Sequence, residues 1–239
     1  MLHNKDIKNL SELNSAFVDK HRNAEFLLSF IDLLKLGKFH SIFSNAKVKG
    51  ISSVLIIKVL IIFPFLDQKN IHNFTQSHWS SFFDFGKDVY YRLKNNAKVN
   101  WRGFLFAVTR QLLKTLSNRE DNQVKGTSSQ VKAFIFDDTV IAKTSYKTEG
   151  TSKVWNHVIQ KHVLGYVLLV MGYYNGSVFI PLNFSFHREK IKNKKNRYGL
   201  KPKHYKKQYR KKRDKNTSGY QRKKELNISK IKAMVKMLR

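Results

Sequence analysis

The sequence contains no cysteine and few acidic residues, and both shortages limit what the protein can be. Without cysteine there is no disulfide scaffold, no thiolate zinc site and no cysteine nucleophile, so a cytoplasmic setting is expected. Only 16 Asp and Glu stand against 46 Lys and Arg, which gives a formal net charge of +30. This charge indicates a polyanionic partner, and nucleic acid is the most common one. A basic structural protein of the ribosomal kind is the alternative that charge alone leaves open.

Proline, glycine and long apolar segments are also scarce. Three prolines and 11 glycines in 239 residues argue against a fibrous or generally disordered chain. The most apolar stretch, residues 51–66, is too short to span a bilayer and contains Lys58 and Pro64. Charged side chains within residues 1–20 exclude a signal-peptide core. We therefore expect no membrane partner, and we predict a buried helix over residues 51–63.

The first half of the chain has the apolar spacing of helices. Residues 12–36 follow this spacing up to Gly37, which is a typical helix end. A short helix plus a loop is expected over residues 70–85, and Asn100 can cap a long amphipathic helix that follows it. These patterns predict an all-helical N-terminal domain, residues 1–120, which we expect to bind DNA.

The spacing of the apolar residues changes from a helical pattern in the first half of the chain to a strand-like pattern in the second half. Residues 121–130 are polar and small, as in a linker. Asn175-Gly176 is a strong hairpin signal, because both residues tolerate the positive φ of a type I′ turn. Pro181 cannot donate a ladder hydrogen bond, so its strand is expected at a sheet edge. The apolar runs predict a three-stranded antiparallel meander over residues 131–138, 166–174 and 177–186. Between them, His157 and His162 are expected in a helix, where their spacing is poor for a shared metal, so they are expected on the surface or facing DNA.

The acidic pair Asp137-Asp138 ends the first apolar run in a chain that is otherwise strongly basic. We predict that Asp138 lies at the C-terminal tip of its strand, where it can bind a hard divalent cation beside a polyanion. Asp137 faces the opposite side of the strand, because successive side chains alternate, and is expected to support the site from there. Taken alone, a strand-terminal acidic pair is more often part of a turn or a helix cap than of a metal site.

Residues 188–225 form a basic segment with 18 Lys or Arg and three acidic residues, interleaved with tyrosines. Such charge density opposes compaction, so we expect the segment to be mobile until it meets a partner. Cations with interleaved aromatic rings suit phosphate contact and base stacking, although a solvated linker explains the pattern equally well. An amphipathic helix is predicted after it, over residues 227–239. The candidate DNA-binding residues are Arg188, Lys190, Lys192, Lys194, Lys195, Arg197, Lys206, Lys207, Arg210, Lys211, Lys212 and Arg213.

Three stretches together resemble the start of the catalytic domain of insertion-sequence DDE transposases, in particular the insertion-sequence-four-like group. They are DDTVIAK at 137–143, Trp155-Asn156-His157 and GYVLLVMGYYNGSVFIPLNFSFHREK at 165–190, with KDVYYRLKNNAKVNWRGFL at 87–105 leading into them. The resemblance implies an RNase H-like fold over residues 131–239, Mg²⁺ or Mn²⁺ as cofactor, and phosphodiester hydrolysis and strand transfer on the double-stranded DNA of transposon ends. It also implies that Asp138 is the first catalytic and metal-binding carboxylate.

The chain departs from the pattern of this family after the terminal helix. The family continues with a strand that carries a second Asp and a later segment that carries a Glu, whereas only Glu149, Glu189, Asp214 and Glu225 follow Asp138 here. We therefore expect an incomplete, C-terminally truncated RNase H-like domain, α+β or α/β in class. Whether such a chain is an enzyme stays open. The alternative is a non-catalytic basic nucleic-acid-binding protein or an inhibitor of a full-length transposase. In each case we expect a protein of the bacterial cytoplasm that associates with the nucleoid, and its expected protein partner is a second copy of the chain or a full-length transposase.

Overall fold

A computed structural model of the chain describes two compact units, residues 1–122 and 123–239. The boundary between them falls in the expected linker, residues 121–130, which lies outside the described residues. The described ranges are 4–20, 24–46, 49–77, 80–81, 85–120, 131–189 and 195–239.

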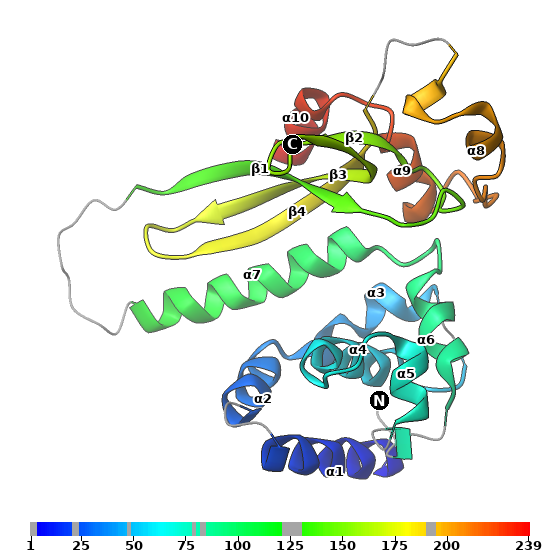
Figure 1. The fold of residues 1–239 in the computed structure, drawn as a ribbon. Coiled ribbons are helices and arrows are strands. Elements are labelled where there is room, and N and C mark those ends of the chain that lie inside the picture. The colour runs from blue at the N-terminus through cyan, green and yellow to red at the C-terminus, as the bar shows by residue number, and fades with distance from the viewer. Residues whose placement is uncertain are drawn as a thin grey trace. The chain divides into compact units, whose positions relative to one another are not determined.

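Within its described residues the first unit consists of helices joined by turns and loops (Figure 1). Its α-helices are α1 (Asn4–Lys20), α2 (Ala24–Leu33), α3 (His40–Ser44), α4 (Ser53–Ile62), α5 (Ile71–Gln76), α6 (Lys87–Lys94) and α7 (Trp101–Glu120). Two short 3-10 helices, η1 (Leu36–Phe39) and η2 (Phe63–Phe65), connect them.

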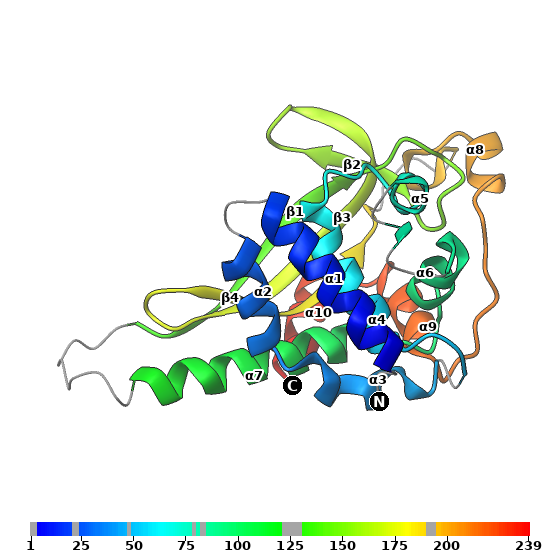
Figure 2. The same cartoon turned by 90° about the horizontal axis from the view of Figure 1, so that it is seen from below.

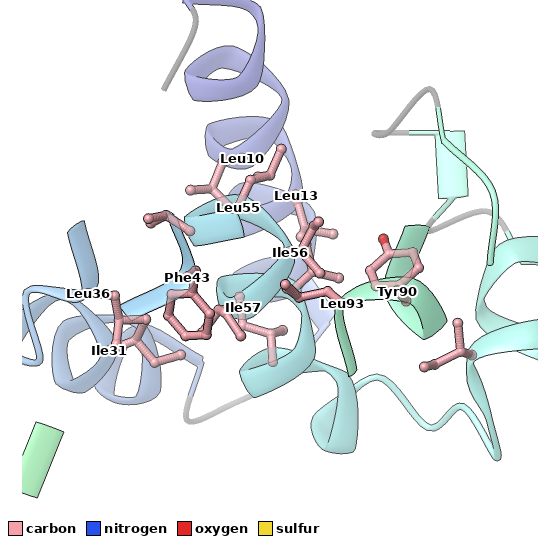
Figure 3. Packing of buried hydrophobic residues seen from close by; sticks show 14 of the residues in the cluster. Leu10, Leu13, Ile31, Leu36, Phe43, Leu55, Ile56, Ile57, Tyr90 and Leu93 are labelled. Atoms are coloured by element: carbon pink, nitrogen blue, oxygen red, sulfur yellow. The ribbon is translucent and has the colours of Figure 1, made fainter. Parts of the chain in front are cut away.

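Helix α4 forms the centre of this unit, as its apolar sequence predicts. Leu55, Ile56 and Ile57 are all buried, so the helix is covered on every side. Figure 3 shows these side chains packed against Leu13 of α1 and Phe43 of α3. A helix that is apolar all round is stable only in such surroundings, and it therefore organises the packing of the others.

The predicted start of α7 is correct, whereas the predicted end of the helix before η1 is wrong. The Asn100 side chain accepts a hydrogen bond from the Gly103 N–H at 2.9 Å and caps α7, as expected. The apolar pattern of residues 12–36 spans two helices, and α2 ends at Leu33 rather than at Gly37. The reason is that Lys35 adopts a left-handed conformation, with φ of 47°, and stops the helix earlier.

The second unit contains a four-stranded antiparallel sheet with helices after it, which makes the fold α+β. Its strands are β1 (Ala133–Ala142), β2 (Ser152–Asn156), β3 (Lys161–Tyr174) and β4 (Phe179–His187). Strand β3 is central: β1 pairs along one side of it, and β2 and β4 pair along the other side, one after the other. Within the described residues β4 pairs with β3 alone, so Pro181 lies on an edge strand, as predicted.

Two details of the sheet differ from the prediction. His157 and His162 lie in a turn and in β3, not in a helix, because Asn156 folds the chain back. Its side-chain Oδ1 accepts hydrogen bonds from the N–H groups of Val158 and Ile159, which creates the hairpin of β2 and β3. The hairpin at Asn175-Gly176 is present, but a four-residue loop, 175–178, joins β3 and β4, and only Gly176 of this pair has positive φ.

The basic segment is folded over residues 195–225, the larger of its two described parts, which contradicts the expectation of mobility. It contains η4 (Arg197–Gly199), α8 (Pro202–Lys206) and α9 (Ser218–Glu225), and α10 (Lys230–Leu238) follows as predicted. Figures 1 and 2 both show α8 at the end of the sheet away from the β3–β4 turn. Helix α10 packs on β3 and β4, and its Ala233 and Met237 are buried.

Candidate functional site

Asp138 lies in the middle of β1, not at its tip. The strand continues to Ala142, because the β-forming residues after Asp138 extend the pairing with β3. Asp138 is opposite Leu169 of β3, which in turn is opposite Ser185 of β4. Its carboxylate forms an ion pair with the ammonium of Lys230 at the start of α10. The helix therefore supplies a cation to the carboxylate that the sequence analysis assigns to a metal.

Asp137 points to the opposite face of the sheet from Asp138, as alternation predicts. Its Oδ1 accepts a hydrogen bond from the backbone N–H of Asp138 at 2.9 Å. The two carboxylates of the pair therefore lie on opposite faces of β1.

A buried histidine lies on the same side of the sheet as Asp138. His187 at the end of β4 is 2% exposed, with Ser185 Oγ 2.6 Å from its Nε2 and the Ile228 carbonyl 3.1 Å from its Nδ1. A carbonyl only accepts, so Nδ1 carries the proton and the Ser185 hydroxyl donates to Nε2. Burial lowers the pKa of His187, although the Ile228 carbonyl and the charges of Glu225 and Asp138 oppose this shift. The imidazole is thus a neutral structural group that joins β4 to the segment before α10.

The residues around Asp138 do not fit a two-metal centre. Within the described ranges, no group of three or more His, Asp or Glu side chains could hold a metal ion. Glu189 accepts hydrogen bonds from the backbone N–H of Trp155 at 3.0 and 3.1 Å, and Asp214 accepts one from the Asn216 N–H at 2.9 Å. Asp138 with Lys230 beside it is therefore a single carboxylate neutralised by a lysine.

Glu149 has a structural role that the sequence analysis missed. Its carboxylate is 14% exposed, with Arg213 Nη2 at 2.5 Å from Oε2 and Lys223 Nζ at 2.9 Å from Oε1. Burial alone would raise the pKa of Glu149, but the hydrogen bonds and charges of Arg213 and Lys223 outweigh it and lower the pKa. The only signal in the sequence was an isolated acid with Lys143, Lys147 and Lys153 nearby, and a largely buried carboxylate requires cationic partners.

The loop between β1 and β2, residues 143–151, holds the basic segment in place, and we call it the docking loop. The carbonyl of Lys147 accepts from the Tyr209 N–H at 2.8 Å, and that of Gly150 accepts from Arg188 Nε at 2.8 Å. Gln208 is buried and donates to the Thr151 carbonyl at 2.8 Å. These bonds, together with the Glu149 ion pairs, connect the segment to the docking loop.

The structure separates the candidate DNA-binding residues into three groups. Arg188 and Arg213 are bound to the docking loop, so their guanidinium groups stabilise the fold. Lys190, Lys192 and Lys194 lie outside the described residues. The remaining candidates are exposed, namely Lys195, Arg197, Lys206, Lys207, Arg210, Lys211 and Lys212.

Arginine and tyrosine side chains alternate next to these exposed cations. The guanidinium carbon of Arg197 lies 5.1 Å from the ring centre of Tyr205, and that of Arg210 lies 5.0 Å from the same ring. Arg188 lies 4.6 Å from the ring centre of Tyr198. The contacts of Arg197 and Arg210 fix the planes of two exposed guanidinium groups that can bind a phosphate. The guanidinium of Arg188 is instead bound to the docking loop.

No protein-family model, curated protein or solved structure matches this chain. Among the described residues, no helix combines the length and the apolar character needed to cross a lipid bilayer.

Proposed function

We propose that this protein binds double-stranded DNA through the exposed cations of residues 195–212. The observation that carries the proposal is that these cations project from a folded segment which a separate set of contacts holds on the sheet. Lys206, Lys207 and Lys212 are exposed, whereas Arg213 is used internally. A fixed array of cations loses little conformational entropy on binding a phosphate backbone, so it binds more tightly than a mobile tail of equal charge.

We further propose that the second unit is an RNase H-like domain related to insertion-sequence DDE transposases. The antiparallel order of β1, β3 and β4, with α10 packed on the side of the sheet that carries Asp138, supports this relation. The resemblance assigns Mg²⁺ to Asp138, but the described residues offer the ion one carboxylate paired with Lys230. DNA binding without strand cleavage is therefore the function that this chain supports best.

Salt-dependent binding to a duplex tests the proposal. The variant Lys203→Gln/Lys206→Gln/Lys207→Gln/Lys212→Gln removes four exposed charges and leaves the contacts of Gln208 and Arg213 intact. Each phosphate contact contributes about −0.9 to the slope of log K against log salt, so the slope should become shallower by roughly 2 to 4.

A variant with equal loss of charge in the helical unit is the matched control. Lys35→Gln/Lys38→Gln/Lys69→Gln/Lys87→Gln changes exposed lysines there. We expect its salt slope to stay closer to that of the wild type than the slope of the first variant. Equal slopes for both variants would show that net charge alone drives binding, and would overturn the assignment to residues 195–212.

A further inference from the structure

Tyr209 is the exposed aromatic residue of the basic segment, with 63% of its surface accessible. The other two tyrosines nearby are engaged: Tyr205 lies between Arg197 and Arg210, and the Tyr198 hydroxyl donates to Asn227 Oδ1 at 3.0 Å. Tyr209, by contrast, contributes its backbone to the fold through the bond to the docking loop. Its ring is therefore not needed for packing.

The backbone of Tyr209 is held on both sides of its Cα atom. Its own N–H donates to Lys147, and the preceding residue, Gln208, is buried with its side chain bonded to the Thr151 carbonyl at 2.8 Å and to Thr151 Oγ1 at 3.0 Å. The following residue, Arg210, is fixed over the Tyr205 ring. An exposed ring on a fixed backbone presents one flat surface in a defined position, at low entropic cost for a ligand.

Exposed cations flank Tyr209 in the sequence. The exposed side chains within three positions of Tyr209 are Lys206, Lys207, Arg210, Lys211 and Lys212. A ligand that is complementary to the ring and to the cations carries a negative charge close to a flat π-system. A nucleotide has both. In a continuous duplex the base faces are covered by stacking, so a protein ring gains access to them where bases are unpaired.

We infer that Tyr209 stacks on an unpaired base, and that the protein consequently prefers DNA with a single-stranded arm to a blunt duplex. This inference rests on the proposed DNA binding and specifies its substrate. Base–aromatic stacking contributes about 1–3 kcal/mol per base, so the loss of the ring weakens binding roughly tenfold. Phosphate contacts of the neighbouring cations are unchanged by that loss.

The test compares the full chain with its variants Tyr209→Ala and Tyr209→Phe on two probes: a forked duplex with 2-aminopurine in its single-stranded arm, and a blunt duplex of the same sequence. We expect Tyr209→Ala to bind the fork about tenfold more weakly, to bind the blunt duplex within about twofold of the wild type, and to lose the quenching of 2-aminopurine. Tyr209→Phe retains the ring and should behave like the wild type.

Phe179→Ala is the matched control, because this ring is 44% exposed and begins β4 at the β3–β4 turn, away from α8 in Figures 1 and 2. It should not change the preference for the fork. If Tyr209→Ala equals the wild type on the fork, or weakens both probes equally, the stacking inference is wrong while DNA binding stands. If the wild type binds neither probe, the proposed function itself fails.

Discussion

The ammonium of Lys230, near the start of α10, is paired with the carboxylate of Asp138 in the middle of β1. The two residues are 92 positions apart, so the pair exists only because α10 packs against the sheet. It places a cation at the carboxylate that the transposase resemblance assigns to a metal ion.

Replacing Lys230 by methionine should change the free energy of unfolding by less than about 1 kcal/mol, because half-exposed ion pairs contribute little. The side chains of Lys230 and Asp138 are 47% and 35% exposed, and methionine preserves most of the apolar stem. Urea unfolding at low and high salt measures the difference. A loss above about 2 kcal/mol would show that the pair is a main support of α10.

The purified chain should not nick supercoiled DNA in Mg²⁺ or Mn²⁺ above the level of its Asp138→Asn variant. A single carboxylate leaves most of the coordination of each ion to water and gives little control of geometry. An agarose-gel assay measures the conversion to open circles. Metal-dependent nicking that Asp138→Asn abolishes and Asp137→Asn preserves would refute the prediction and establish Asp138 as a metal ligand.

Glu149→Gln should destabilise the second unit by about 1.5–3 kcal/mol, which is typical for charge-assisted hydrogen bonds. The variant leaves Arg213 and Lys223 without their largely buried anion. The folded-state pKa of Glu149 is lowered, so its contribution is complete above its ordinary value of 4.5 and is lost as the pH falls through the folded pKa. Thermal unfolding from pH 7 to pH 3 measures both effects.

Glu12→Gln on α1 is the control for this variant, since Glu12 is half exposed and pairs with Lys8 at 3.8 Å. This variant should lower the free energy of unfolding by less than about 0.5 kcal/mol. Equal effects of Glu149→Gln and Glu12→Gln would mean that the ion pairs of the docking loop do not stabilise the fold.

His187 should make the second unit less stable as the pH falls below about 6.5, the ordinary pKa of histidine. Its folded-state pKa is lowered, so the unfolded chain binds the proton more readily and the stability contribution is complete only above the ordinary value. His187→Gln should flatten the decline of the unfolding temperature between pH 7 and pH 5. An unchanged decline in this variant would assign the pH dependence to other groups.

Tyr90→Phe should leave the helical unit equally stable or more stable by about 1 kcal/mol. Tyr90 is 1% exposed, and its hydroxyl has no hydrogen-bond partner among the described residues. Burial accordingly raises its pKa. Removing an unsatisfied buried hydroxyl relieves a desolvation cost of about 1–3 kcal/mol. Tyr91→Phe on the same helix, where the residue is half-buried, is the control. Clear destabilisation by Tyr90→Phe alone would reveal a bonded hydroxyl.

The sequence alone determined those elements whose signals are local. The apolar composition of α4, the Asn100 cap of α7, the long strands on either side of Asn175-Gly176 and the amphipathic α10 all depend on neighbours within a few residues. Hydrogen-bonding caps and apolar periodicity act at this range, so the helical unit and most of the sheet were predictable. Strand β2 was missed because it is short and ends in a turn made by one asparagine side chain.

The tertiary structure determined which groups the residues of the candidate site are paired with. Gln208 meets Thr151 across 57 positions, Arg213 meets Glu149 across 64, and Lys230 meets Asp138 across 92. A prediction from charge density considers only neighbours in the sequence, and it therefore predicts repulsion and a mobile segment. Folding instead brings a buried acid and the carbonyl groups of the docking loop to these cations, and the resulting desolvated contacts outweigh the repulsion between exposed charges screened by solvent.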